Sequence, residues 1–201
     1  MSPRREARRP RGATLIELIM FIVVVGAAVT GVVGAIMYAT RASVDPMIHK
    51  QALAIAEAVL EEVQLMPFTY CDPDDPQAAT ALSTAVGANG CTALASVENI
   101  NAEATPPYGP ETRLSATTPY DNVNDYNGFT MAGGIVDIAG NAVPMPELAA
   151  YTASVAVAGQ ALSGIAAAES LLITVTVTHP SLSPSLVLHG YRTRYAPNAL
   201  P

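Results

Sequence analysis

The stretch "RGATLIELIMFIVVVGAAVTG", residues 11–31, decides how this chain is organised. It begins with an arginine and a glycine and continues as an apolar run with one acid, Glu17, near its start. No residue from Leu18 to Thr40 is charged. At about 1.5 Å per helical residue these residues cover roughly 34 Å, which is enough to cross the hydrocarbon core of a bilayer and too long for the apolar region of a cleaved signal peptide. The sequence therefore predicts a membrane-spanning helix.

The charges on the two sides of this run differ, and they predict its orientation. Five arginines precede it, Arg4, Arg5, Arg8, Arg9 and Arg11, whereas only Arg41 and Lys50 follow it closely. The positive-inside rule then places the N-terminus in the cytoplasm and the residues after about 41 on the far side. The whole chain has a formal charge of −7. Without residues 1–12, which hold five of the ten basic and one of the 17 acidic residues, the charge becomes −11. Such an acidic exported part argues against a general nucleic-acid surface.

The helical pattern continues beyond the span. Apolar residues recur at nearly helical spacing at Ile48, Ala52, Ile55, Val59, Leu60 and Val63, and polar residues occupy much of the other side, at Lys50, Glu57, Glu61, Glu62 and Gln64. Pro46 lacks a backbone donor and disfavours helical angles at Asp45, which predicts a kink or brief break there. We expect one long helix from about residue 14 to residue 66, ended by Pro67, with its second half packed on a globular head.

The head is predicted to be β-rich. Residues 68–130 read as mostly irregular, because "TYCDPDDPQ", "TPPYGPETR" and "TTPYDNVNDYNGF" are dense in turn formers, and a short helix around residues 78–85 is the regular element that the pattern allows there. Alternation in "YTASVAVAG", "LLITVTVTHP" and "SLVLHGYRTRYAP" predicts three strands of an antiparallel meander, whose valine face should cover the apolar side of the helix. The predicted fold class is α+β. We expect a basic leader at residues 1–12, a spanning helix at 13–41, an amphipathic helix at 42–67 and a β-rich head at 68–201.

The two cysteines, Cys71 and Cys91, both lie in the predicted exported part. An oxidising compartment favours a disulfide between them, which would stabilise the head by about 3 kcal/mol through restriction of the unfolded chain. Two free thiols are the alternative. A zinc site would need four ligands, and no Cys or His cluster supplies the others.

The order of features at the N-terminus resembles the class III signal of type IV prepilins and pseudopilins. Basic residues lead to Gly12, then to Ala13-Thr14-Leu15-Ile16-Glu17-Leu18 and a long apolar helix. The resemblance implies that a prepilin peptidase cuts after Gly12 and methylates the new N-terminus, Ala13, where the family usually has phenylalanine. A glycine suits the cleavage point because its backbone enters an enzyme cleft without a side chain.

The same resemblance implies a role for Glu17. In an assembled filament its carboxylate would pair with the α-amino group of a neighbouring subunit, which neutralises both charges and fixes the axial register. The alternative is an interfacial residue of a plain membrane anchor. Gly26, Gly31 and Gly34 allow close helix packing in lipid, and the family resemblance adds a loss of helicity on assembly, so both interpretations stay open.

Later stretches, "ASVDPMIHKQALAIAEAVLEEVQ", "YDNVNDYNGF" and "LLITVTV…LHGYRTRYAP", resemble minor prepilins of the mannose-sensitive haemagglutinin (MSHA) pilus, especially its D-type biogenesis proteins. The resemblance implies a non-enzymatic subunit that is processed in a bacterial inner membrane, with a periplasmic head, and that enters or primes a pilus filament. The implied partners are the prepilin peptidase, major and minor pilins, and the inner-membrane assembly platform with its motor ATPase. No cofactor is implied. The alternatives are a type II secretion pseudopilin and a tip subunit for adhesion or DNA uptake.

Acidic, histidine and tyrosine–arginine groups elsewhere in the chain are further candidate sites. Asp121, Asp125 and Asn127 invite a calcium hypothesis, but their spacing misses the EF-hand register and a polar turn explains them equally well. His49, His179 and His189 come without a nucleophile motif, so the sequence predicts no catalytic site. Tyr191, Arg192, Arg194 and Tyr195 fit either a contact surface or ordinary strand packing at a solvated edge.

Overall fold

A computed structural model describes residues 14–98, 108–138 and 146–201, and within this range it leaves the side chains of residues 40–45 undescribed. The predicted leader and the predicted cleavage point between Gly12 and Ala13 lie outside the described residues. The chain divides into two compact units, Met1–Pro46 and Met47–Pro201. Each unit is described by itself.

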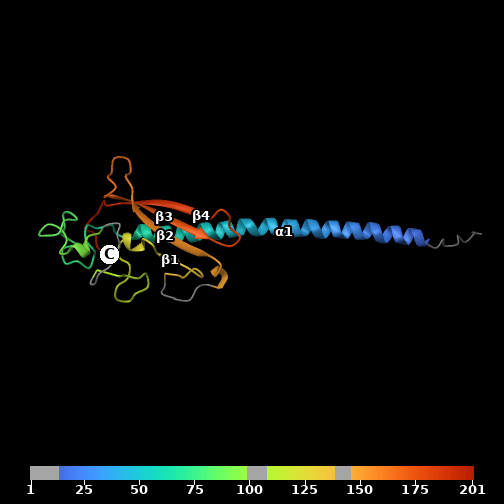
Figure 1. Cartoon of the computed structure of the whole chain (residues 1–201), viewed down its shortest axis with the longest axis horizontal. Coiled ribbons are helices and arrows are strands. Elements are labelled where there is room, and N and C mark those ends of the chain that lie inside the picture. Colours follow the sequence, from blue (N-terminus) through green and yellow to red (C-terminus); the bar gives the residue numbers. More distant parts are fainter. Residues whose placement is uncertain (1–13, 99–107, 139–145) are drawn as a thin grey trace, which may run out of the picture. The chain divides into compact units, whose positions relative to one another are not determined.

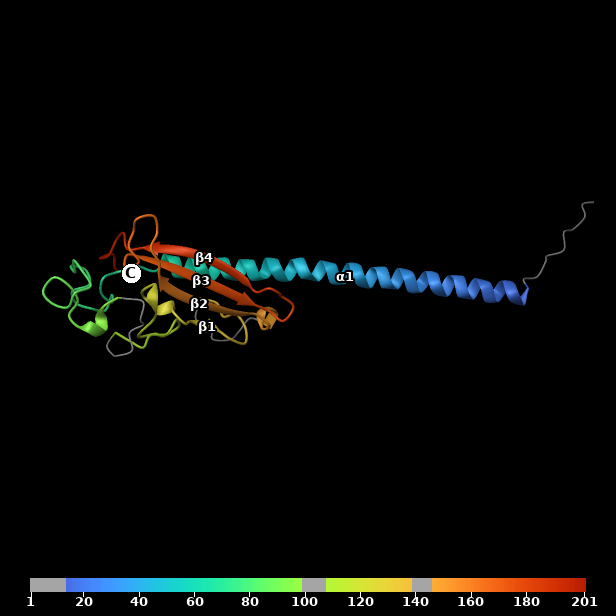
Figure 2. The same cartoon turned by 45° about the horizontal axis from the view of Figure 1, so that its top comes forward.

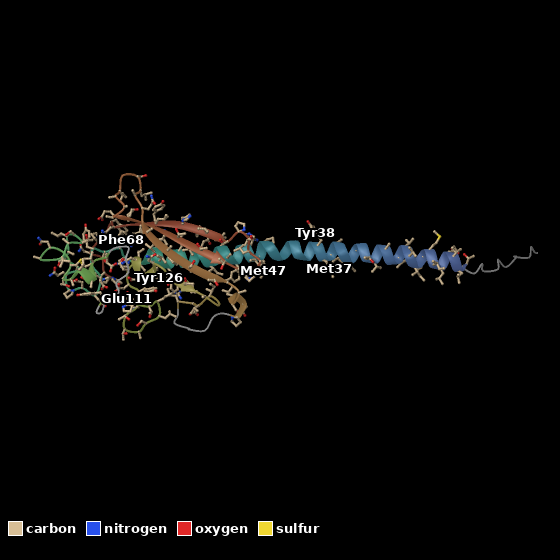
Figure 3. The ribbon with its side chains drawn as sticks, viewed as in Figure 1. Met37, Tyr38, Met47, Phe68, Glu111 and Tyr126 are labelled. Carbon is tan, nitrogen blue, oxygen red and sulfur yellow. A yellow bond between two sulfur atoms is a disulfide. The ribbon has the colours of Figure 1, made fainter. Side chains whose placement is uncertain are left out.

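The first unit contains the start of the long helix α1, Leu15–Leu65 (Figure 1). Within it, Leu15–Ala39 is long and apolar enough to cross a membrane, as the sequence predicts. Its side chains are exposed in the isolated chain, including Met37 and Tyr38, which Figure 3 labels. The helix is also continuous through Pro46, so the predicted brief break is wrong. A proline removes only one bond of the ladder, and the helical turns on both sides hold the backbone.

The second unit is a four-stranded antiparallel sheet packed on the last part of α1 (Figures 1 and 2). The strands are β1 (Thr130–Met131), β2 (Thr152–Gly159), β3 (Ser170–Thr178) and β4 (Leu186–Thr193), in the order β1-β2-β3-β4. The three longer strands confirm the predicted meander. The two-residue β1 is an addition, because such a short strand leaves no alternation to detect. The α+β fold with a membrane-capable helix is therefore confirmed.

The core lies between the helix and the sheet. All six predicted apolar positions of the helix are buried, and so are the inward residues of β2 and β3, which include Val155, Val157, Ile173, Val175 and Val177. At Gly190 in β4 the helix comes close, because an added Cβ would lie 2.8 Å from Cδ1 of Leu60 and 2.5 Å from Nε2 of Gln64. A residue without a side chain thus lets the helix reach the edge strand.

One polar residue of the helix lies elsewhere than predicted. Glu62, expected on the solvated side, is 9% exposed and forms a bidentate ion pair with Arg113. Nε of Arg113 donates to Oε1 at 2.6 Å and Nη2 to Oε2 at 2.8 Å, and the hydroxyl of Tyr126 donates to Oε1 at 2.7 Å. The correction has a physical reason: a buried carboxylate is tolerated when charged and neutral donors satisfy both oxygens.

The predicted disulfide is present. Cys71 and Cys91 are bonded, with their Cα atoms 5.4 Å apart, and both are fully buried in a small second core with Ala78, Ala81 and Val97. The predicted helix at residues 78–85 is wrong. The N–H of Ala81 does bond to the Gln77 carbonyl at 2.8 Å, but the N–H of Leu82 bonds to the Asn89 carbonyl at 2.9 Å instead of continuing the turn. The bond between Leu82 and Asn89 therefore ends the helical pattern after a single turn.

Candidate functional site: the helix start and an acidic loop cluster

Glu17 lies in the first turn of α1, among apolar side chains that are largely exposed. Its backbone N–H bonds to the Thr14 hydroxyl at 3.4 Å, and an acid in the first turn suits the partial positive charge of a helix N-terminus. The sequence from Leu15 to Ala39 contains no Lys, Arg or His. Within the span, then, the carboxylate has no opposite charge, although ionised groups in membrane helices are usually paired.

The three glycines of the span are helical in the structure. A Cβ added at Gly26, Gly31 or Gly34 would meet nothing within 4 Å, and the Thr30 hydroxyl donates to the Gly26 carbonyl at 2.8 Å. No contact inside the described part of the chain therefore requires glycine at these positions. The surface that they leave open suits close approach by another helix in lipid.

Acidic side chains gather in the loops of the head. Ligand oxygens of Asp72, Asp74 and Asp121 lie within 4.8 Å of one another, and so do those of Glu111, Asp121 and Asp125. Asp121 and Asp125, predicted as calcium candidates, thus come together with three acids that sequence reasoning missed. The third calcium candidate, Asn127, accepts at its Oδ1 from the N–H of Val157 at 3.0 Å. We call the five acids the acidic cluster; Figure 3 labels Glu111.

Four acids of the acidic cluster, Asp72, Glu111, Asp121 and Asp125, have a raised pKa. Burial, reinforced by repulsion from neighbouring carboxylates, raises the pKa of Asp72 to about 7, of Asp121 to about 8 and of Glu111 to about 9. Burial also raises the pKa of Asp125, although the N–H groups of Asn122 and Asp121 donate to its carboxylate and oppose the shift. Carboxylate oxygens are the ligands that Ca²⁺ takes, so these groups have the chemistry to hold a divalent cation.

We expect the head to melt at a higher temperature at pH 5 than at pH 8.5. Groups with a raised pKa in the folded state stabilise it fully below their unfolded pKa, and this contribution is lost as pH rises through the folded pKa. The window for Asp72, Asp121 and Glu111 therefore runs from about pH 4 to about pH 9. Because one pKa unit is worth about 1.4 kcal/mol and 1 kcal/mol moves Tm by about 2–4 °C in a unit of this size, the difference should be at least ~5 °C by near-ultraviolet circular dichroism.

Asp121→Asn should raise Tm at pH 8.5 and flatten this pH dependence, because it removes one mutually repelled carboxylate. Glu57→Gln is the matched control, since Glu57 lies exposed on α1 outside the acidic cluster. The pKa of Asp75 is shifted in the opposite direction. Burial would raise this pKa, but bonds from Ser96 and Thr92 lower it overall, so the contribution of Asp75 to folding stability is retained at both pH values. A lower Tm at pH 5, or equal effects of Asp121→Asn and Glu57→Gln, would contradict the prediction.

The remaining candidates make local contacts. Nδ1 of His179 accepts from the N–H of Ser181 at 3.1 Å, and Nδ1 of His189 lies 3.1 Å from the Thr174 hydroxyl. His49 lies exposed on α1.

Arg194 does not share a surface with Arg192 and Tyr195. Arg192 stacks on the exposed ring of Tyr195 at 5.0 Å, whereas the side chain of Arg194 is 3% exposed and lies 3.9 Å from the ring centroid of Phe68. Arg194 also pairs with Glu169 at 3.1 Å, so its role is to hold the C-terminal segment on the head.

Comparison of the chain with protein-family models, with curated proteins and with solved structures finds no match. The feature that most needs a partner is the carboxylate of Glu17, set in an apolar span without a cation.

Proposed function

We propose that this chain is a minor type IV pilin-like subunit, processed by a prepilin peptidase and incorporated into a pilus filament or used to prime one. The observation that carries the proposal is Glu17, an acid at the start of an exposed apolar helix whose span holds no opposite charge. The glycine that precedes it by five residues, Gly12, and the arginine cluster before that glycine complete the resemblance to a prepilin signal.

In this proposal the span anchors the precursor in a bacterial inner membrane, with the leader in the cytoplasm and the head in the periplasm. Cleavage after Gly12 creates a new α-amino group at Ala13. A neighbouring subunit presents its Glu17 to this amine, or this chain presents Glu17 to the neighbour's amine. Two charges that are costly in lipid neutralise each other, and the pair sets the position of one helix along the next.

The architecture of the head supports this role. The last part of α1 buries its apolar side under the sheet, so the head and the helix that carries it are joined through a shared core. The Glu62–Arg113 pair fixes an irregular segment to that core, and the disulfide closes a loop in the small second core. The work of such a subunit is assembly and not catalysis. Its partners would be the peptidase, the major and other minor pilins, and the assembly platform with its motor ATPase.

Mass spectrometry of the N-terminus tests the proposal directly. The membrane-extracted protein should begin at a methylated Ala13, because the peptidase removes residues 1–12. Gly12→Val should leave the leader attached on essentially all molecules, since a branched side chain blocks the extended entry of the cleavage point. Ser2→Val, which changes the leader away from the junction, is the control and should be processed normally. An intact N-terminus on the wild type, while the peptidase processes its other substrates, would remove the basis of the proposal.

A further inference from the structure

One side of the head carries an apolar groove with a volume of about 620 Å³. Its floor consists of buried side chains, among them Ile55 and Val59 of α1 and Ile135 from the segment after β1. At its rim, Leu65 is 73% exposed and Ile138 is 67% exposed. The groove therefore presents continuous apolar surface to solvent, which marks a binding surface more often than an ordinary exterior.

The dimensions of the groove suit a helix. It follows α1 from Gln51 to Leu65, which corresponds to about 21 Å at 1.5 Å per residue, or about four helical turns. Ala54 and Ala58 lie one turn apart on α1, and both are exposed. Their short side chains allow another helix to approach α1 closely. A helix satisfies its own backbone groups, so it can lie on this apolar surface without backbone partners from the groove.

The charges around the groove select among possible helices. Glu61 of α1 and Asp137 line the groove, the exposed Glu57 lies one helical turn before Glu61, and the exposed Glu147 directly precedes the lining residue Leu148. Lys50 directly precedes the lining residue Gln51, and the cation of Arg113 is engaged by Glu62. The acidic side chains outnumber the available cation, so the groove favours an occupant that carries positive charge beside its apolar face.

A second copy of this chain does not meet that requirement. Its apolar segment Leu15–Ala39 contains Glu17 as its one charged residue, and the exposed side of its second α1 half again presents Glu57 and Glu61. Like charges across an interface cost several kcal/mol. The occupant is therefore another protein.

We propose that this groove binds an amphipathic helix of a partner protein, whose apolar side chains fill the groove while its lysine or arginine side chains face Glu57, Glu61 and Glu147. Recognition is of the helix-in-groove kind, in which apolar anchors give affinity and flanking charges give selectivity. This inference does not depend on the proposed function, because it rests on the groove and its charges alone.

Two synthetic helical peptides of about 15 residues test the inference, since that length matches the groove. They share one leucine face and differ only in having lysines or glutamates beside it. Binding is measured by fluorescence anisotropy to the full chain in phosphatidylcholine nanodiscs, with empty nanodiscs as the blank. We expect the lysine peptide to bind at least about tenfold more tightly than the glutamate peptide, because their flanking charges meet the acidic side chains with opposite signs.

Two variants assign the binding to the groove. Ala58→Trp, which fills the groove from an exposed position, should lower the affinity for the lysine peptide at least about tenfold. Ala79→Trp, at an exposed position outside the groove, should leave that affinity within about twofold of the wild type. Glu61→Lys should lower the affinity for the lysine peptide and raise the affinity for the glutamate peptide. Equal affinity for both peptides, equal effects of the two tryptophans, or displacement of the lysine peptide by oleate would overturn the proposal. So would concentration-dependent self-association of the full chain that Ala58→Trp abolishes, because a second copy would then be the occupant.

Discussion

Arg113→Met should destabilise the head by about 3–5 kcal/mol, the cost of leaving one member of a buried ion pair without its partner. Arg113 and Glu62 each have side chains that are 8% exposed, and they are joined by two short charge-assisted bonds. The bonds to Glu62 raise the pKa of Arg113 although burial opposes the shift, so its guanidinium is charged at neutral pH. Denaturant unfolding of the full chain in detergent, followed by the near-ultraviolet signal of the tyrosines, measures the loss.

The double variant Glu62→Met/Arg113→Met should be more stable than either single variant, because replacing both charges removes the uncompensated one. It should not reach the wild type, since the hydroxyl of Tyr126 loses its acceptor and the carbonyl of Val136 loses a donor. Arg192→Met is the matched control. That side chain mainly stacks on the exposed Tyr195, and its loss should cost about 0.5–1 kcal/mol. A loss of similar size in Arg113→Met and Arg192→Met would contradict the role given to the pair.

This ion pair shows where sequence reasoning stops. The helical spacing of apolar residues correctly places the buried side of α1, because periodicity reports which side faces a core. It cannot report that Glu62, next to that side, meets an arginine 51 residues later in an irregular segment. The pairing follows from the path of the loop, and loops leave no periodic signal.

The sheet can be predicted from the sequence, whereas the acidic cluster can be predicted only in part. Alternation in the three C-terminal strands predicts both the meander and its inward valines, since each strand carries its own pattern. Asp121 and Asp125 stand out as a local group of acids, but Asp72 and Glu111 join them only through tertiary folding. The disulfide was predictable because the chain offers just two cysteines. Features with a local sequence pattern, such as the strands, or with a single possible pairing, such as the disulfide, can be predicted from the sequence. Contacts that depend on how the loops fold, such as those of Asp72 and Glu111, cannot.

Glu17→Ala should insert into the membrane normally and lose at least about tenfold of its incorporation into filaments. Insertion is unaffected or improved, because removal of a charge from an apolar helix lowers the cost of transfer into lipid. Incorporation should fall because a neighbour's α-amino group is left without a counter-charge in a medium of low dielectric. Close charge pairs at interfaces couple by about 1.5–7 kcal/mol. A loss of ~1.4 kcal/mol already lowers a binding equilibrium tenfold. Quantitative immunoblots of sheared filaments and of the membrane fraction measure the ratio.

Two further variants separate the charge of Glu17 from its shape. Glu17→Gln keeps the size and removes the charge, so it should fail as Glu17→Ala does, whereas Glu17→Asp keeps the charge on a shorter stem and should retain part of the incorporation. Mass spectrometry of each variant must show a processed N-terminus at Ala13, so that a defect in cleavage is not mistaken for one in assembly. If processed Glu17→Gln enters filaments as well as the wild type, the carboxylate is not the group that sets the position of one helix on the next. The glycine-lined surface of the span would then have to set it through helix packing alone.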